Sequence, residues 1–274
     1  MSAFPEKIEG AIFTEIDPKL TPEINSKDLI KLGVIVRKKG YNKKYEPLTD
    51  SLRKIQWVKI CGLRAIAIEK EITSKKEPNV FVFAPSLQVA HSLNVTDIIL
   101  HSKSALDSIA VFLTDLLTLG ETGGDRDLKK KKFRDDVLRK DPSFGLDLME
   151  FEPWLNELQN IRDEWIHRTS IRVAIIQGKS EIGALPIPKD VTKGVGALDL
   201  ELNKQNFWST EEFVNIHYSN LTNLFQKLIV RCIEIESMGL SSPVTINYDE
   251  SKLGFFPTRS TENITPKTIR FYNP

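Results

Sequence analysis

The stretch NVTDIILHSKSALDSIAVFLTDLLTL, residues 94–119, decides the fold class. Its apolar residues recur every three or four positions, which is the period of an amphipathic α-helix. Both ends fit a helix, because Asn94 suits the N-cap, Asp97 places negative charge in the first turn and Gly120 follows the last apolar residue. A mainly α-helical protein built around this segment is therefore predicted.

Further helices follow this one along the chain. Residues 125–140 are short and highly charged with a thin apolar stripe, and residues 147–168 carry apolar side chains at helical spacing. The last helix begins at the capping box Ser209-Thr210-Glu211-Glu212 and continues to Gly239. The prediction is a bundle of about four main helices.

Three segments outside these helices have strand-like patterns. Residues 30–36 alternate apolar and more varied side chains, and Val80–Phe83 is a β-branched and aromatic run before a proline. Residues 171–203 combine apolar alternation with glycines and prolines, which predicts a small β insertion between the third and fourth helices. Residues 52–72 fit either period and stay undecided.

The expected organisation has three parts. A lead-in of mixed α and β structure over residues 1–90 packs on a helical domain over residues 91–240, and residues 241–274 form an extended tail. The tail is rich in proline and carries only isolated aromatic residues, which is typical of extended chain.

Composition and charge exclude several classes of protein. Hydrophobic residues make up 41% and charged residues 27% of 274, as in ordinary globular proteins. The net charge of +1 excludes a globally basic surface, so any contact with nucleic acid must be a local patch. Cys61 and Cys232 are too few for a disulfide framework or a four-cysteine zinc site. With no signal peptide and no membrane-length apolar run, a reducing, cytoplasmic compartment and no membrane partner are expected.

Motifs of common nucleotide and hydrolase chemistry are missing from the sequence. It contains no P-loop, no H-E-x-x-H, no G-x-S-x-G and no EF-hand loop. His91, His101 and His217 are interpreted as solvent-facing or hydrogen-bonded side chains. No cofactor and no metal site are predicted.

His167 differs because of its neighbourhood, Arg162-Asp163-Glu164-Trp165-Ile166-His167. An arginine followed by four residues and a histidine, at the end of a long helix, resembles the R-x(4-6)-H signature of the HEPN superfamily (higher eukaryotes and prokaryotes nucleotide-binding). The order of helices over roughly residues 90–240 is also similar to that family. The resemblance implies a HEPN-like helical bundle and a homodimer that places both copies of the motif in one cleft.

The resemblance also implies metal-independent cleavage of RNA. His167 would act as general base or acid on a ribose 2′-hydroxyl, and Arg162 would neutralise charge that develops on the scissile phosphate. The products would be a 2′,3′-cyclic phosphate and a 5′-hydroxyl. Basic residues expected to attract the RNA backbone are Arg168, Arg172, Lys129, Lys130, Lys131 and Lys132.

Helix geometry sets a condition on this chemistry. Five residues on an unbroken helix advance by about 500°, so Arg162 and His167 lie about 140° apart around its axis. Either unwinding just past Trp165 or pairing of the two segments across a two-fold axis would bring them together. Family members commonly have asparagine after the arginine, whereas Asp163 stands here and its carboxylate can pair with Arg162.

Two functions therefore stay open. The first is an endoribonuclease, such as a microbial toxin or phage-defence effector, for which an antitoxin-type protein partner is expected. The second is a non-catalytic RNA-binding or protein-interaction module on the same scaffold. In that case Arg162 and Glu164 belong to a solvated ion-pair face, and the lysine run is a solvated helix face.

Overall fold

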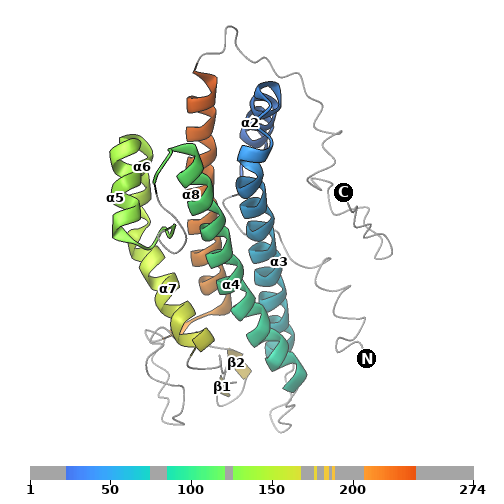
Figure 1. Cartoon of the computed structure of the whole chain (residues 1–274). Helices are drawn as coiled ribbons and strands as arrows, with labels where there is room; N and C mark the ends of the chain where they lie inside the picture. The colour runs from blue at the N-terminus through green and yellow to red at the C-terminus, as the bar shows by residue number, and fades with distance from the viewer. Residues whose placement is uncertain are drawn as a thin grey trace, which may run out of the picture. The chain divides into compact units, whose positions relative to one another are not determined.

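Two long helices, α3 (Glu46–Ser74) and α4 (Pro85–Leu116), form the largest packing contact of this computed structural model. They run side by side through the bundle in Figure 1. Their shared interior is apolar, with side chains such as Ile55, Val58 and Ile98 fully buried. The segment 52–72, undecided by period, is therefore helical throughout.

The structure describes residues 23–74, 85–120, 126–167, 176–177, 182–184, 187–188 and 207–238, all within one unit, Lys19–Leu240. The other helical elements are α2 (Ser26–Lys39), η1 (Lys43–Tyr45), α5 (Lys131–Lys140), α6 (Pro142–Glu150), α7 (Glu152–His167) and α8 (Thr210–Ser237). The predicted mainly helical class is confirmed. Within the described residues no helix has both the length and the apolar character needed to cross a membrane.

Helix α8 is the central element of the bundle. It contacts α2, α3, α4 and α6, and its buried face includes Phe213, Leu221, Leu224, Phe225, Leu228 and Cys232. Its start is the predicted one, because Ser209 Oγ accepts a hydrogen bond of 3.1 Å from the backbone N–H of Glu212. A capping residue followed by a long amphipathic run was a sufficient signal here.

The prediction of a strand at residues 30–36 is wrong, because these residues lie inside α2. Asn25 caps this helix by accepting a hydrogen bond of 3.0 Å from the Lys27 N–H. Gly40 ends it in the left-handed conformation, with φ of 70°. Leu32, Ile35 and Val36 are buried. These buried positions lie three and four residues apart, as on one side of a helix, and do not alternate as in a strand.

Helix α4 extends beyond the predicted segment at its N-terminal end and stops short of it at the other. It begins at Pro85, so the expected domain boundary at residues 90 and 91 falls inside it. Asn94 is an interior residue, not a cap, and its Nδ2 donates 2.7 Å to the Ala90 carbonyl. After Leu116 the chain turns at Thr118, whose φ of 52° lies in the left-handed region.

The helix expected over residues 147–168 is two helices, α6 and α7, separated by Phe151. Pro153 explains the break, because a proline inside a continuous helix would lose a hydrogen bond and clash with the preceding turn. Asp141 caps α6 by accepting a hydrogen bond of 3.2 Å from the Phe144 N–H. Its carboxylate also accepts a hydrogen bond of 2.7 Å from Arg231 of α8.

The predicted β-rich additions are not supported. Residues 30–36 are helical, and Val80–Phe83 lies outside the described residues. The described part of 171–203 contains only the two- or three-residue strands β1 (Ile176–Gln177), β2 (Ile182–Ala184) and β3 (Ile187–Pro188). β1 pairs with β2, and β3 pairs with β4 (Phe207–Trp208), both antiparallel.

A buried carboxylate on α8 joins the first and last described helices. Glu236 accepts hydrogen bonds from Tyr45 Oη at 2.9 Å, Lys39 Nζ at 2.9 Å and Lys44 Nζ at 3.3 Å. Its side chain is 5% exposed. Burial alone would raise the pKa of Glu236, but the hydrogen bonds from Lys39, Tyr45 and Lys44 and the positive charge of Lys44 lower it.

Candidate functional site

The Arg-x4-His motif occupies the C-terminal part of α7. The core side of this helix carries the buried residues Trp154, Leu155, Leu158 and Ile161. Gln159 and Asp163 lie one turn apart, and Arg162 adjoins Asp163. Together Gln159, Arg162 and Asp163 form a polar group that we call the α7 cluster.

Asp163 holds Arg162 in place. Arg162 Nη1 donates a hydrogen bond of 2.9 Å to Asp163 Oδ1, and Gln159 Nε2 donates to the same oxygen. Burial alone would raise the pKa of Asp163, but these hydrogen bonds and the positive charges of Lys129 and Arg162 lower it. Asp163 is therefore ionised at neutral pH, and Arg162, 32% exposed, lies beside a formal negative charge.

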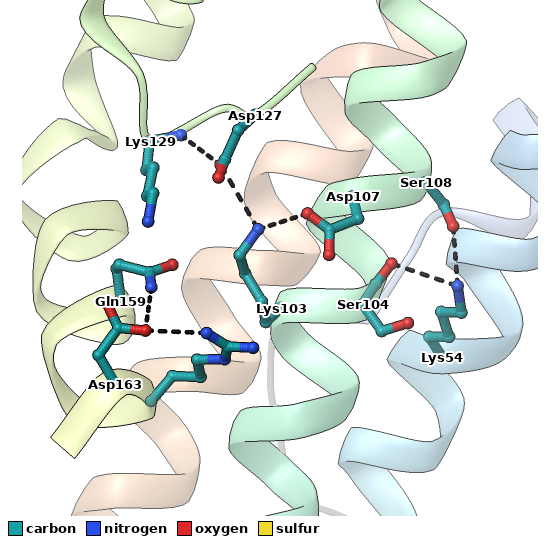
Figure 2. A network of polar contacts seen from close by, with 10 residues as sticks. Lys54, Lys103, Ser104, Asp107, Ser108, Asp127, Lys129, Gln159 and Asp163 are labelled. Carbon is teal, nitrogen blue, oxygen red and sulfur yellow. Dashed lines mark hydrogen bonds and ion pairs between the residues drawn. The ribbon is translucent and has the colours of Figure 1, made fainter. Parts of the chain in front are cut away.

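A loop before α5 brings Lys129 to the α7 cluster. Arg134 is buried beneath this loop, where its Nη1 donates 2.9 Å to the Leu128 carbonyl and also contacts the Lys129 carbonyl. Its Nη2 pairs with Glu152 in the first turn of α7. One buried guanidinium thus fixes the loop relative to α7, and Figure 2 shows the Lys129 side chain directed toward Gln159 and Asp163.

Helix α4 contributes a second cation to the same area. Lys103 Nζ contacts Asp107 one turn later and lies 3.4 Å from Asp127 Oδ1. Asp127 Oδ1 also accepts a hydrogen bond of 3.0 Å from the backbone N–H of Lys129. Figure 2 shows these residues of α4 and the loop opposite Gln159 and Asp163 of α7. The arrangement places ammonium and guanidinium groups from three chain segments on one side of the bundle.

Within one copy, the backbone of α7 places positions 162 and 167 at separate points around the helix. Helix α7 is unbroken through His167, so unwinding just past Trp165 is not observed, and positions 162 and 167 remain about 140° apart. Arg168 and Arg172 lie outside the described residues. A single copy therefore presents the two motif positions on different sides of α7.

The lysine run is divided between a loop and a helix start. Lys129 and Lys130 are half-buried, whereas Lys131 and Lys132 are exposed in the first turn of α5. Lys130 is the N-cap and forms no side-chain capping bond. Positive charge is unfavourable at a helix N-terminus, so these lysines are not placed there to stabilise α5.

Sequence reasoning missed Gln159, Lys103 and Asp127. Gln159 had a detectable signal, because it precedes Asp163 by four residues on a predicted helix. Lys103 likewise precedes Asp107 by four residues. The approach of Asp127 and Lys129 had no such signal, since it depends on the tertiary contacts of Arg134.

Two histidines are buried in the bundle. His91 Nε2 lies 2.9 Å from Thr210 Oγ1, and His217 Nδ1 accepts a hydrogen bond of 3.1 Å from Trp154 Nε1. Burial lowers the pKa of His91 to about 4 and that of His217 to about 3. Both are therefore neutral at pH 7. They are hydrogen-bonded core residues, as the sequence interpretation expected.

An open cleft of about 740 Å³ lies between the start of α3 and the middle of α4. Its lining includes the cations Lys43 and Arg53 and the carboxylates Glu46, Asp50 and Asp107. Asp50 is already engaged, because its Oδ2 lies 2.6 Å from Lys54 Nζ and 2.9 Å from Ser108 Oγ. The mixture of charges does not indicate one class of ligand.

Comparison with protein-family models, with curated proteins and with solved structures finds no match for this chain. Within the described residues no group of three or more His, Cys, Asp or Glu side chains is arranged to hold a metal ion. The site is thus defined by its own geometry, a helix end carrying Arg162 and His167 with Lys129 and Lys103 nearby.

Proposed function

We propose that this chain is a metal-independent endoribonuclease of HEPN type that acts as a homodimer. The observation that carries the proposal is the α7 cluster. A partly exposed arginine is held in a fixed position at the end of the motif helix, with Lys129 beside it. A guanidinium fixed in this way matches the oxygens of an RNA phosphate.

The reaction has a role for each motif residue. The ribose 2′-oxygen attacks the adjacent phosphorus, and His167 of one copy takes its proton. Arg162 neutralises charge on the phosphate as the bond to the 5′-oxygen breaks. The leaving 5′-oxygen takes a proton from a general acid, and the protonated His167 of the other copy is suited to this role. The products are a 2′,3′-cyclic phosphate and a 5′-hydroxyl.

The lysines before and within α5 support attraction of the RNA backbone. Lys130, Lys131 and Lys132 occupy the start of α5, where positive charge does not favour the helix. Lys129 lies at the α7 cluster. Binding through such lysines weakens as salt rises, because counterions compete for the phosphates. A toxin or phage-defence role, and restraint by an antitoxin-type partner, would follow from the same activity.

The test is cleavage of end-labelled total RNA in the presence of EDTA. The wild-type protein should cut, whereas Arg162→Ala and His167→Ala should lose the cleavage. Arg139→Ala is the matched control, because Arg139 is 72% exposed on α5 and, within the described part of the chain, its ion pair is a local one with Asp136. Intact RNA with folded wild-type protein at several salt concentrations would contradict the proposal.

The second candidate function is a non-catalytic RNA-binding or interaction module. The Arg162–Asp163 ion pair favours it, because the carboxylate partly neutralises the charge that a phosphate would meet. In that case the wild-type protein retards labelled RNA on a native gel but leaves it uncut. On the same gel, loss of the retardation in Arg162→Ala would show that Arg162 takes part in binding rather than in cleavage.

Replacing Asp163 with asparagine tests whether its negative charge lowers the cleavage rate by partly neutralising Arg162, or whether Asp163 only positions the guanidinium. Asp163→Asn keeps an acceptor for Gln159 and Arg162 but removes the negative charge. We expect cleavage to become faster by about twofold to fivefold, because an exposed ion pair is worth up to about 1 kcal/mol. The initial cleavage rate at fixed salt measures this. A rate equal to or below wild type would mean that Asp163 does not restrain Arg162.

A further inference from the structure

The turn between α2 and η1 carries a dense group of positive charges. Five of the eight residues 37–44, RKKGYNKK, are lysine or arginine, and a tyrosine lies between them. The net charge of the whole chain is only +1, so this turn is a local concentration of positive charge. We call residues 37–44 the α2–η1 turn. A chain of this composition can contact nucleic acid only through a local basic patch of this kind.

Helix stability accounts for only part of this charge. Arg37 and Lys38 are exposed in the last turn of α2, where positive charge favours the helix. Lys43 and Lys44 precede the N-terminus of α3, where positive charge is unfavourable. In the described part of the chain, no carboxylate lies within ion-pair distance of Arg37, Lys38 or Lys43. Three cations of the turn are therefore available to an anionic partner.

Backbone hydrogen bonds fix Tyr41 at the centre of the α2–η1 turn. The Gly40 N–H donates 3.1 Å to the Arg37 carbonyl, and the Tyr41 N–H donates 3.0 Å to the Val36 carbonyl. The Tyr41 carbonyl accepts a hydrogen bond of 3.3 Å from the Tyr45 N–H. The Tyr41 side chain is 40% exposed. An aromatic ring is thus held at the surface before any ligand binds, which lowers the entropic cost of binding.

Glu236 places two further cations beside the Tyr41 ring. Its buried carboxylate accepts hydrogen bonds from both Lys39 and Lys44. The Nζ atoms of these lysines lie 5.8 Å and 5.3 Å from the centroid of the Tyr41 ring, within the range of cation–π contacts. Two ammonium groups share one carboxylate, so positive charge remains at the ring. The ring and the charges beside it are therefore preorganised together.

An exposed aromatic ring among cations suits a single strand of nucleic acid. An unpaired base stacks on the ring, and the cations on either side meet the phosphates. An anionic membrane fits less well, because peripheral membrane segments also insert apolar side chains. Apart from its cations, the turn exposes Gly40, Tyr41 and Asn42 and no aliphatic side chain. The chemistry therefore favours a base and its phosphates over a lipid headgroup.

Helix α4 connects this turn to the α7 cluster. Tyr45, the residue after the α2–η1 turn, packs on Phe112 of α4 with ring centroids 5.0 Å apart. Lys103 lies nine residues earlier on α4, which is about 13 Å along the helix axis. Lys43 and Asp107 line the same open cleft, and Asp107 contacts Lys103 opposite the α7 cluster (Figure 2). A single strand can therefore reach from the turn to the α7 cluster.

The carboxylates along this path are largely neutralised. Asp107 pairs with Lys103, and Asp50 pairs with Lys54 at 2.6 Å. Arg53 adds an exposed cation to the lining of the cleft. The path therefore repels a phosphate strand less than free carboxylates would.

We propose that the α2–η1 turn is a binding site for single-stranded nucleic acid, in which one base stacks on Tyr41 and the adjoining phosphates meet the exposed cations of the turn. This site is separate from the α7 cluster, and its binding does not rest on the ribonuclease function. That the same strand continues to the α7 cluster as the RNA substrate does rest on that function.

Fluorescence anisotropy of a short labelled oligodeoxythymidylate with the full chain tests the stacking. This probe has no 2′-hydroxyl, so binding is measured without cleavage. Tyr41→Ala should raise the Kd by about tenfold, whereas Tyr41→Phe keeps the ring and should stay within about twofold of wild type. Trp57→Ala is the matched control, because Trp57 is an aromatic residue 45% exposed on α3, and its Kd should not change. Equal affinity of Tyr41→Ala and wild type would overturn the proposal.

Two further probes define the nucleic acid. An oligouridylate should bind within about threefold of the DNA strand, because stacking and phosphate contacts do not read the 2′-hydroxyl. A DNA duplex of the same length should bind more weakly, since its bases are already stacked. A duplex bound as tightly as the single strand would exclude stacking on Tyr41 and contradict the proposal.

Salt dependence tests the phosphate contacts. Lys38→Ala and Lys43→Ala should each reduce the slope of log K against log salt concentration by about 0.7, because each loses one phosphate of a single strand. Lys31→Ala is the matched control, since Lys31 is exposed on α2 seven residues before Lys38, and its slope should equal that of wild type. Unchanged slopes in Lys38→Ala and Lys43→Ala would show that the turn does not contact the strand.

The competing partner is an anionic membrane surface. Wild type should not sediment with vesicles of phosphatidylserine and phosphatidylcholine at a salt concentration where it binds the oligonucleotide. Sedimentation that is lost in Lys38→Ala and retained in Tyr41→Ala would assign the turn to lipid headgroups and overturn the proposal.

Cleavage of end-labelled RNA tests whether one strand occupies both places. Tyr41→Ala should raise the KM of cleavage and leave kcat unchanged, because Tyr41 positions the strand away from the reacting atoms. An unchanged KM would refute the shared strand. If wild type binds the oligonucleotide through Tyr41 but cuts no RNA, the ribonuclease function fails and the binding site stands.

Discussion

Lowering the pH from 7 to 5 is expected to destabilise the protein by about 4 kcal/mol through His91 and His217 alone. Burial lowers their pKa values to about 4 and about 3, against about 6.5 in an unfolded chain. Between these values the unfolded chain binds protons that the folded one does not. The stability contributed by the two neutral histidines is therefore complete above pH 6.5 and is lost as the pH falls toward their folded pKa values.

Urea unfolding followed by circular dichroism at pH 7, 6 and 5 measures this effect. In this pH range each histidine contributes up to about 1.4 kcal/mol per pH unit to the slope of the free energy of unfolding against pH. His91→Gln and His217→Gln should each remove about half of the slope, whatever their own cost to stability. Equal stability of the wild-type protein at pH 7 and pH 5 would contradict the prediction.

Glu236→Ala is expected to destabilise the protein by about 3 kcal/mol or more, because it removes one partner of a buried charge group. Lys39 and Lys44 would remain partly buried without their carboxylate, and the Tyr45 hydroxyl would lose its acceptor. Since hydrogen bonds and lysine charge lower the pKa of Glu236, its contribution is present above the unfolded pKa of about 4.3 and is lost below it.

The matched control for Glu236→Ala is Glu234→Ala. Glu234 lies on the same helix and is 51% exposed, and among the described residues its ion pair is with Arg231 three residues away. Its loss should cost about 0.5 kcal/mol or less. Urea unfolding at pH 7 compares the two variants. If both lost the same small amount of stability, the Glu236 contacts would not hold α2 and η1 to α8.

Strong apolar periodicity predicted the presence of both α4 and α8, but the predicted N-cap is correct only for α8, because Asn94 lies inside α4. Ser209 and the amphipathic run after it predicted the start of α8 correctly. Residues 30–36 were misread because seven residues can satisfy both a strand and a helix period. Their flanking residues Asn25 and Gly40, which cap α2, carried the information that decided the structure.

Tertiary contacts explain the rest of the site. The Arg162–Asp163 pair could be anticipated because the two residues adjoin. The approach of Lys129 could not, because Arg134 fixes the loop by binding carbonyl groups and Glu152. The break between α6 and α7 could have been predicted from Pro153, because a proline is not tolerated inside a continuous helix. The helical spacing of the apolar residues continues on both sides of the proline and does not by itself indicate the break.

The central position of α8 has a consequence for synthesis of the chain. Lys39 and its partner Glu236 are 197 residues apart, so the apolar faces of α2, α3 and α4 are translated well before the helix that covers them. At about 5–20 residues per second, the ribosome takes about 10–40 s to cover that distance. During this interval the nascent chain displays uncovered core surface, so chaperone capture should be strongest before α8 leaves the exit tunnel.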